Sequence, residues 1–242
     1  MLDDDSRSLI GTANNEHGPR GLFYSNTADP AGVWAGRKGV SFDIDALERA
    51  MSSVSTDDDF DLIAGELCGA DTFDLSTRGD LARGYGGNDT LNGSGGADPL
   101  YGGDGNDKVN GGTGNDRLFG EAGQDKFYAG AGRDIMDGGD DAARDTFLFD
   151  DGDSAAGSKR DTILHFAEGS DILDLSRIDS DVASSQDNAF AWSDHIAASH
   201  SIWWTATADG VVLSGDVTGD AKADFEVVPA GAVTLTSEDV FV

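Results

Sequence analysis

The stretch GGDGNDKVNGGTGNDRLFG, from Gly102 to Gly120, decides the fold of this chain. It crowds glycine and aspartate together and leaves few large apolar residues. Its pattern is G-G-x-G-x-D-x-U-x, where U is a large apolar residue, and it recurs in six consecutive nonads from Gly84 to Asp137. A fixed period of this kind indicates a repeat architecture in which each unit stacks on its neighbours. The aspartates in this register are Asp71, Asp80, Asp89, Asp98, Asp107, Asp116, Asp125 and Asp134.

The geometry of one coil explains the composition of the nonad. The first six positions form a tight turn, because glycine adopts at little cost the positive φ that other residues avoid. The last three positions form a very short strand with a single inward side chain. Two nonads make one coil, so the apolar residues of alternate nonads fill a thin core between two parallel sheets. We expect Leu91, Val109 and Phe127 in one sheet and Leu100, Leu118 and Met136 in the opposite one.

The same stacking brings carboxylates together. Asp89, Asp107 and Asp125 lie one strand spacing apart, about 4.8 Å. Two bare charges at that distance repel by roughly 1 kcal/mol in water and by about 3.5 kcal/mol at an effective dielectric near 20. Calcium removes this penalty, since it is a hard cation that takes about six to eight oxygen ligands, carboxylate and carbonyl alike. We therefore expect each nonad to form half of a calcium site.

The nonads resemble the parallel β-roll of RTX, or haemolysin-type, calcium-binding proteins. The resemblance implies that each ion lies between turns two nonads apart, held by the aspartate of the earlier turn and by carbonyls. In this chain Asp89 then pairs with carbonyls of Gly102, Asp104 and Asn106, Asp98 with those of Gly111, Thr113 and Asn115, and Asp107 with those of Gly120, Ala122 and Gln124. Asp116 faces a turn that departs from the pattern, which implies a weaker site. The residues of that turn are Ala129, Ala131 and Arg133.

The overall composition agrees with a calcium-dependent fold. The formal net charge is −30, and 34 of the 242 residues are glycine, so the metal-free chain approaches the high-charge composition of disordered proteins. Such a charge repels phosphate backbones, which excludes nucleic acid as an expected partner. No stretch reaches the roughly 18 apolar residues of a transmembrane helix. The start of the chain lacks the pattern of a cleaved export signal, and we expect no stable membrane insertion.

The C-terminal third predicts short strands separated by Asp/Gly turns, in residues 145–150, 160–179 and 215–228. These segments resemble the C-terminal domain of serralysin-type secreted metalloproteases, in which D-x-I-x-D-F-x-x-G-x-D-x-(I/L)-D-L-S and D-x-x-G-D-x-x-A-D-F recur. His165 replaces the usual aspartate of the first motif. The final residues DVFV, Asp239 to Val242, resemble the uncleaved signal that type I secretion machines read.

These patterns predict that the chain is divided into three parts. We expect residues 1–65 to cap the open end of the roll, with a short helix around Ala46 to Ser53. Residues 66–145 form the calcium-binding RTX β-roll. Residues 146–242 form a β-sandwich-like, serralysin-like cap domain with the type I secretion signal. The expected fold class is therefore all-β.

No catalytic motif accompanies the repeats. A zinc protease of the serralysin kind needs H-E-x-x-H on a helix, and none of the four histidines lies in that context. His195 and His200 lie five residues apart, which does not align them on a helix. The G-x-S-x-G motif of esterases does not occur either. We therefore expect no enzyme activity.

The segment DVTGDAKAD, Asp216 to Asp224, has the acidic spacing of an EF-hand loop. It lacks the glycine and the bidentate glutamate that such a loop needs, since Ala221 and Val227 stand at those positions. We interpret it as a hairpin turn, with calcium binding as the minority alternative.

The sequence thus predicts a secreted, extracellular, non-enzymatic protein that folds on calcium binding after type I export. Its expected partners are calcium ions and a type I exporter. Two alternatives remain open: a detached C-terminal module of a protease or polysaccharide-modifying enzyme, and a small RTX toxin.

Overall fold

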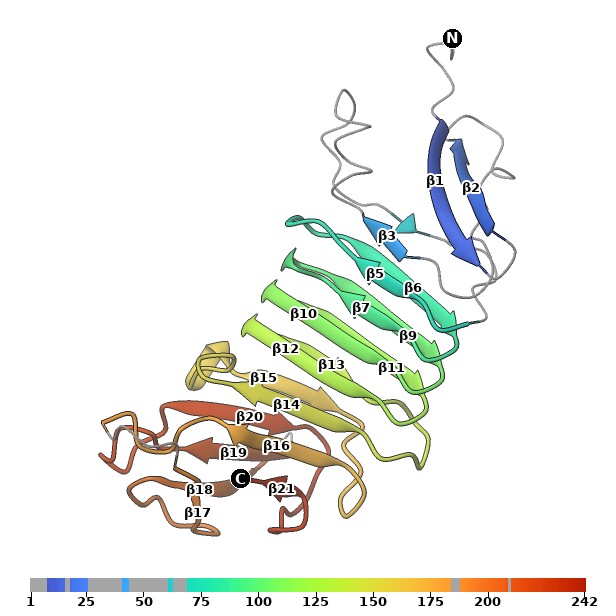
Figure 1. The fold of residues 1–242 in the computed structure, drawn as a ribbon. Coiled ribbons are helices and arrows are strands. Elements are labelled where there is room, and N and C mark those ends of the chain that lie inside the picture. The colour runs from blue at the N-terminus through green and yellow to red at the C-terminus, as the bar shows by residue number, and fades with distance from the viewer. Residues whose placement is uncertain are drawn as a thin grey trace.

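The computed structural model describes residues 8–15, 18–25, 41–43, 61–62, 69–183, 188–208 and 210–242. The predicted helix around Ala46 to Ser53 lies outside these residues. Strands β1 (Ser8–Asn15) and β2 (Gly18–Ser25) pair antiparallel in a sheet of their own. The repeat region winds into stacked coils, which Figure 1 shows in green between β1–β2 and the orange and red C-terminal strands.

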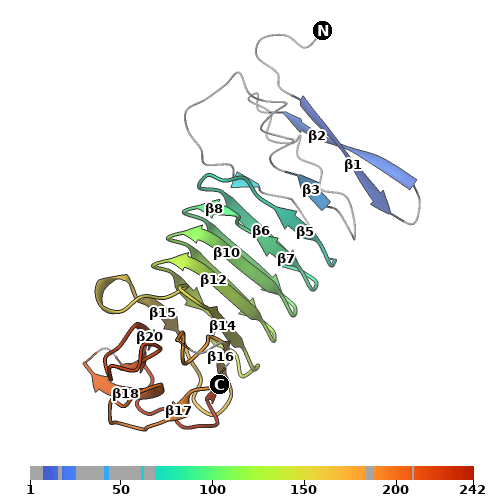
Figure 2. The ribbon, with the colours of Figure 1, turned by 60° about the vertical axis from the view of Figure 1, so that its left-hand side comes forward.

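The first long sheet is parallel throughout. Its strands, in spatial order, are β3 (Ser41–Asp43), β5 (Thr72–Asp74), β7 (Thr90–Asn92), β10 (Lys108–Gly114), β12 (Lys126–Gly132), β14 (Thr146–Asp150), β16 (Ile172–Arg177) and β21 (Val240–Phe241). The short strand β8 (Gly95–Gly96) pairs with β10 beside this path. The turned view in Figure 2 shows the strands from β3 to β16 stacked one coil after another along the roll.

The second long sheet forms the other wall. Its strands, in spatial order, are β4 (Asp61–Leu62), β6 (Leu81–Gly86), β9 (Pro99–Asp104), β11 (Arg117–Ala122), β13 (Ile135–Asp137), β15 (Asp161–Leu164), β20 (Phe225–Pro229), β19 (Gly210–Gly215), β18 (Ser201–Thr207) and β17 (Ala191–Trp192). Only β18–β19 and β19–β20 are antiparallel. A short 3-10 helix, η2 (Gly157–Lys159), precedes β15.

The register confirms the predicted core. Val109 lies level with Leu91 and Phe127 in the first sheet. Leu118 lies level with Leu100 and Met136 in the second. All six side chains have no exposed surface. Because strand side chains alternate between the two faces, one inward residue per nonad is enough to fill the space between the sheets.

The turns stack closely because they are rich in glycine. A Cβ on Gly105 would lie 1.8 Å from the carbonyl oxygen of Gly87 in the coil below, and Gly105 has a φ of +136°. Any other residue would clash there and strain the backbone. The glycines therefore set the close approach between coils.

The C-terminal strands continue the roll. β14, β16 and β21 extend the first sheet, and β15 and β20 extend the second. Their inward residues, such as Phe147, Ile163 and Leu173, join the core of the repeats. The predicted all-β fold with a parallel roll is confirmed, and the two sheets face each other in this region as a sandwich-like cap requires. Neither sheet is interrupted at the expected boundary after residue 145.

Candidate metal centre

The repeat aspartates form two ladders of hydrogen bonds along the roll. In each rung, the main-chain N–H of one aspartate donates to Oδ1 of the aspartate one coil later. The N–H of Asp89 donates to Asp107 Oδ1 at 2.7 Å, and the N–H of Asp98 donates to Asp116 Oδ1 at 2.9 Å. The same bond joins Asp71 to Asp89, Asp80 to Asp98, Asp107 to Asp125 and Asp116 to Asp134. One carboxylate oxygen of each accepting aspartate, from Asp89 to Asp134, is thereby fixed.

The second carboxylate oxygen, Oδ2, has no such partner. It is buried and accepts no hydrogen bond in Asp89, Asp98, Asp107, Asp116, Asp125 and Asp134. These side chains are at most 2% exposed. Burial of an anionic oxygen without a hydrogen-bond donor costs free energy. A cation bound beside this row of oxygens would remove that cost.

A carbonyl oxygen joins the carboxylate at four of these aspartates. A Cβ on Gly84 would lie 2.2 Å from Asp89 Oδ2 and 2.4 Å from the carbonyl oxygen of Gly102. Both oxygens thus border the same small space, which stays open because residue 84 is a glycine. The same arrangement holds for Asp98 with Gly111 O beside Gly93, for Asp107 with Gly120 O beside Gly102, and for Asp116 with Ala129 O beside Gly111. We call these four oxygen pairs the paired sites.

The paired sites have the chemistry of a calcium site. Calcium takes carboxylate and carbonyl oxygens together, and each paired site offers one of each with no side chain between them. No group of three or more His, Cys, Asp or Glu side chains suited to a metal occurs in the part of the chain that the structure describes. The resemblance to the β-roll implies that carbonyl oxygens would complete the coordination of a cation on the ladder.

Burial controls the ionisation of the ladder when no cation is bound. It raises the pKa of Asp89 and of Asp98 to about 7, against the opposing effect of the main-chain N–H donor. Burial also raises the pKa of Asp107 to about 6 and that of Asp125 to about 7. Neighbouring acidic side chains contribute to the same rise in pKa. The metal-free ladder therefore binds protons near neutral pH.

The first carbonyl residue predicted for three of the sites lies beside a repeat carboxylate. Gly102, Gly111 and Gly120 each supply the carbonyl of a paired site. Asp116 has the same geometry through Ala129, although the sequence suggested a weaker site there. A change of side chain leaves a carbonyl ligand in place, which explains the similarity.

The other predicted carbonyl residues lie in the same turns and tie adjacent coils together. The carbonyls of Asp104 and Ala122 accept hydrogen bonds of 2.7 Å from the N–H groups of Gly87 and Gly105. The side chain of Asn106 accepts a bond from the N–H of Gln124, and that of Asn115 accepts one from Arg133. The N–H of Thr113 donates to the carbonyl of Ser94.

Sequence reasoning missed that both ladders continue beyond the nonads. The N–H of Asp125 donates to Asp145 Oδ1, and that of Asp145 donates to Asp171 Oδ1. In the other ladder the N–H of Asp134 donates to Asp161 Oδ1 at 2.7 Å. These rungs span 20, 26 and 27 residues, so the fixed period no longer marks them. The only sequence signal is an aspartate directly before an apolar strand.

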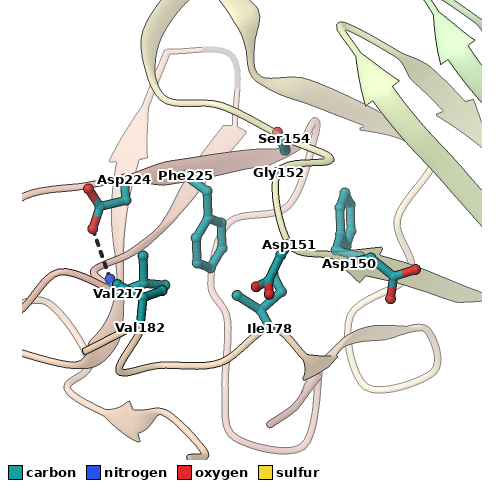
Figure 3. A pocket seen from close by; sticks show the side chains of 10 residues that line it. Asp150, Asp151, Gly152, Ser154, Ile178, Val182, Val217, Asp224 and Phe225 are labelled. Carbon is teal, nitrogen blue, oxygen red and sulfur yellow. Dashed lines mark hydrogen bonds between the residues drawn. The ribbon is translucent and has the colours of Figure 1, made fainter. Parts of the chain in front are cut away.

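The EF-hand-like segment is a hydrogen-bonded hairpin turn. Strands β19 and β20 pair antiparallel on either side of it. Asp216 accepts bonds from the N–H groups of Thr218, Gly219 and Ala221. Asp224 Oδ2 accepts one from Val217, which Figure 3 shows as a dashed line. The acidic side chains are therefore used to fix the turn.

A cavity of about 300 Å³ lies beside this turn. Phe149, Ile178 and Phe225 are among its apolar lining residues, and Asp150, Asp151 and Asp224 also line it. Figure 3 shows Phe225 and Ile178 facing each other across it. None of the residues that line it belongs to the two ladders. It is thus separate from the candidate metal centre.

The described histidines make local contacts. His165 lies 2.7 Å from Asp137, and this hydrogen bond raises the pKa of its imidazole. His200 Nδ1 lies 2.6 Å from the carbonyl of Ser180, and His195 Nδ1 lies 3.3 Å from that of Trp204. Within the described residues, no helix is long and apolar enough to cross a membrane.

Comparison with protein families identifies the repeats. Residues 74–109, 83–118 and 110–142 match the model of the RTX calcium-binding nonapeptide repeat. The chain therefore carries RTX calcium-binding repeats, and these residues hold most of the ladder described above. No match was found among curated proteins.

The solved structures that match this chain include two subunits of one epimerase. The AlgE6R2 subunit of the Azotobacter vinelandii mannuronan C5-epimerase is 24% identical, with a TM-score of 0.39, over 72% of this chain and 91% of that one. The AlgE6R3 subunit is 22% identical, with a TM-score of 0.25, over 74% and 81%. The extracellular lipase LipA of Serratia marcescens is 16% identical, with a TM-score of 0.29, over 84% of this chain and 42% of the lipase.

Proposed function

We propose that this chain is a secreted, non-enzymatic RTX protein that folds when it binds calcium after type I export. The observation that carries the proposal is the paired site. In four successive half-coils, a buried carboxylate oxygen without a hydrogen-bond donor lies beside a main-chain carbonyl oxygen. Bound calcium would neutralise the carboxylates and bridge adjacent coils.

Calcium binding supplies free energy on the scale of folding. Calcium at about ten times its dissociation constant stabilises a folded chain by roughly 1.4 kcal/mol per site. Four paired sites then contribute on the order of 6 kcal/mol, which is comparable to the whole stability of an ordinary domain. Without calcium, a chain of charge −30 repels itself and favours an expanded state.

This balance suits a protein that crosses a membrane unfolded. Extracellular calcium modules bind with dissociation constants of about 10⁻⁴ to 10⁻³ M, so sites of that class stay empty in the cytosol and fill outside. An expanded chain passes a narrow export channel, and folding outside opposes its return. The resemblance of residues 239–242 to a type I secretion signal is what suggests this route.

A calcium titration tests the folding part of the proposal. The chelated protein should gain β-structure by circular dichroism as calcium rises from micromolar to millimolar. Magnesium is the control cation, because it demands octahedral geometry and keeps several of its waters, so it should give a much smaller change. A protein already fully folded in chelator, or one that responds equally to both cations, would refute calcium-driven folding.

A further inference from the structure

At one position of the ladders the repeat aspartate is present, but the residue beside its carboxylate is not glycine. The nonad AGAGRDIMD, from Ala129 to Asp137, places Asp134 where every other nonad places its aspartate. Asp134 makes the usual rung, since its Oδ1 accepts the N–H of Asp116 at 2.7 Å. Its Oδ2 is buried and has no hydrogen-bond partner. In its rung and its burial, Asp134 matches Asp116.

The residue beside the carboxylate differs. Strand register places Asn110 level with Tyr128 and Gly112 level with Gly130, so Ala129 occupies in its coil the position that Gly111 occupies one coil earlier. A Cβ on Gly111 would lie 2.5 Å from Asp116 Oδ2 and 2.6 Å from the neighbouring carbonyl oxygen. The four paired sites all have glycine at this position.

Ala129 has that Cβ. Its side chain is completely buried, as is that of Asp134, so the methyl group lies on the inner side of the coil with the carboxylate. Contacts shorter than 3.0 Å between a Cβ and an oxygen force one of them to move. The carboxylate of Asp134 and a carbonyl of the next coil thus cannot approach each other as the oxygens of the paired sites do.

We infer that Ala129 closes the metal site of Asp134, so that the last nonad keeps its structural rung but binds no calcium. This inference rests on the proposed calcium binding of the paired sites. The two carboxylate oxygens of a repeat aspartate then have different roles. Oδ1 joins the coils in every rung, and Oδ2 contributes to a metal site only where glycine leaves the space open.

The inference is tested by counting calcium ions per chain, by equilibrium dialysis against calcium chloride followed by metal analysis. Ala129→Gly should bind one ion more than the wild-type chain. Ala142→Gly, at an exposed alanine outside the nonads, is the matched control and should leave the count unchanged. The double variant Ala129→Gly with Asp134→Asn should return to the wild-type count.

Asparagine substitutions in the wild-type background complete the test, because they keep the Oδ1 rung. Asp116→Asn should lose one ion, whereas Asp134→Asn should lose none. The inference is overturned if Asp134→Asn loses an ion, or if Ala129→Gly gains none while the wild-type chain binds calcium. A wild-type chain that binds no calcium at millimolar concentration would instead overturn the proposed function itself.

Discussion

The main-chain N–H of Asp89 donates a 2.7 Å hydrogen bond to Oδ1 of Asp107, whose Oδ2 lies near the carbonyl oxygen of Gly120. One carboxylate thus accepts a hydrogen bond from the coil before it through Oδ1, and its Oδ2 lies on the side of a carbonyl oxygen of the coil after it. If the proposed function holds, cohesion between coils and cation binding depend on the same side chain. Substitution of a repeat aspartate therefore affects both.

Asp107→Ala tests this double role. The variant leaves the buried N–H of Asp89 without an acceptor, which costs about 1–3 kcal/mol, and removes one oxygen of a paired site. We expect at least a tenfold loss of calcium affinity, equivalent to about 1.4 kcal/mol, together with a lower thermal midpoint in chelator. Isothermal titration calorimetry and thermal melts measure the two effects.

Asp104→Ala is the matched control in the same turn. The side chain of Asp104 is exposed, and only its carbonyl was predicted to take part in the site. Its removal should change calcium affinity by less than a factor of about two, within the usual effect of surface substitutions. Equal losses for Asp104→Ala and Asp107→Ala would show that general charge, and not the ladder, governs binding.

Gly84 and Gly86 provide a second matched pair on one strand, β6. A Cβ on Gly84 would lie 2.2 Å from Asp89 Oδ2, whereas a Cβ on Gly86 would meet nothing closer than 3.9 Å. Neither residue has a positive φ. We expect Gly84→Ala to abolish binding at the Asp89 site and Gly86→Ala to bind as the wild-type chain does. Calcium counts for the two alanine variants decide the matter, and a normal count for Gly84→Ala would contradict the assigned geometry.

The sequence predicts the repeat region well because the structure of each nonad is set by the residues of that nonad. A fixed period sets the register, and one apolar residue per nonad fixes which side chains, such as Val109 and Leu118, face the core. The paired carbonyl of Gly102 followed from the resemblance to the RTX roll. The Oδ1 rung did not, because the period places two aspartates together without specifying whether their oxygens face a cation or an N–H.

Outside the repeats, long-range pairing limits what the sequence predicts. β20 follows the β18–β19 hairpin but lies beside β15, some sixty residues earlier in the chain. β21 lies beside β16. Apolar runs such as that of β15 show that a strand forms but carry no period that selects its neighbour. The extension of the ladder to Asp145 and Asp161 is hidden for the same reason, since insertions lengthen the coils.

The pH dependence of the metal-free protein follows from the ladder. Burial raises the pKa of Asp134 and Asp145 to about 7 and that of Asp161 to about 8, from an ordinary value of 3.8. Between these limits the folded chain binds more protons than the unfolded chain, so its stability falls as the pH rises through 4 to 8. In chelator, β-structure should therefore be greater at pH 5 than at pH 8 by circular dichroism.

Two controls separate this effect from general repulsion. Added salt at pH 8 screens the exposed charges but has little effect on buried ones, so it should restore only part of the structure seen at pH 5. In millimolar calcium the pH dependence should shrink, because the cation competes with protons for the same carboxylates. Identical spectra at pH 5 and pH 8 in chelator would contradict the assigned burial of the ladder.

The C-terminal residues test the link between folding and export. Asp239 accepts bonds from the N–H groups of Gly169 and Thr236, and its carbonyl accepts one from Leu173. Val240 is 6% exposed, whereas Phe241 is 60% exposed. The folded chain thus incorporates most of the predicted secretion signal into the end of the first sheet, and a deletion of residues 239–242 would remove both the signal and part of the fold.

Phe241→Ser separates the two roles. Its side chain is exposed, so the substitution should change the free energy of unfolding in calcium by no more than about 0.5 kcal/mol. It also removes an apolar residue of the predicted signal. Val240→Ser, its buried neighbour, should lower both stability and export. Secreted protein is measured in the medium of a host with a type I exporter, and melts are measured on purified protein. If Phe241→Ser appears in the medium at the wild-type level while Val240→Ser is lost, export follows stability alone, and these residues do not act as a secretion signal.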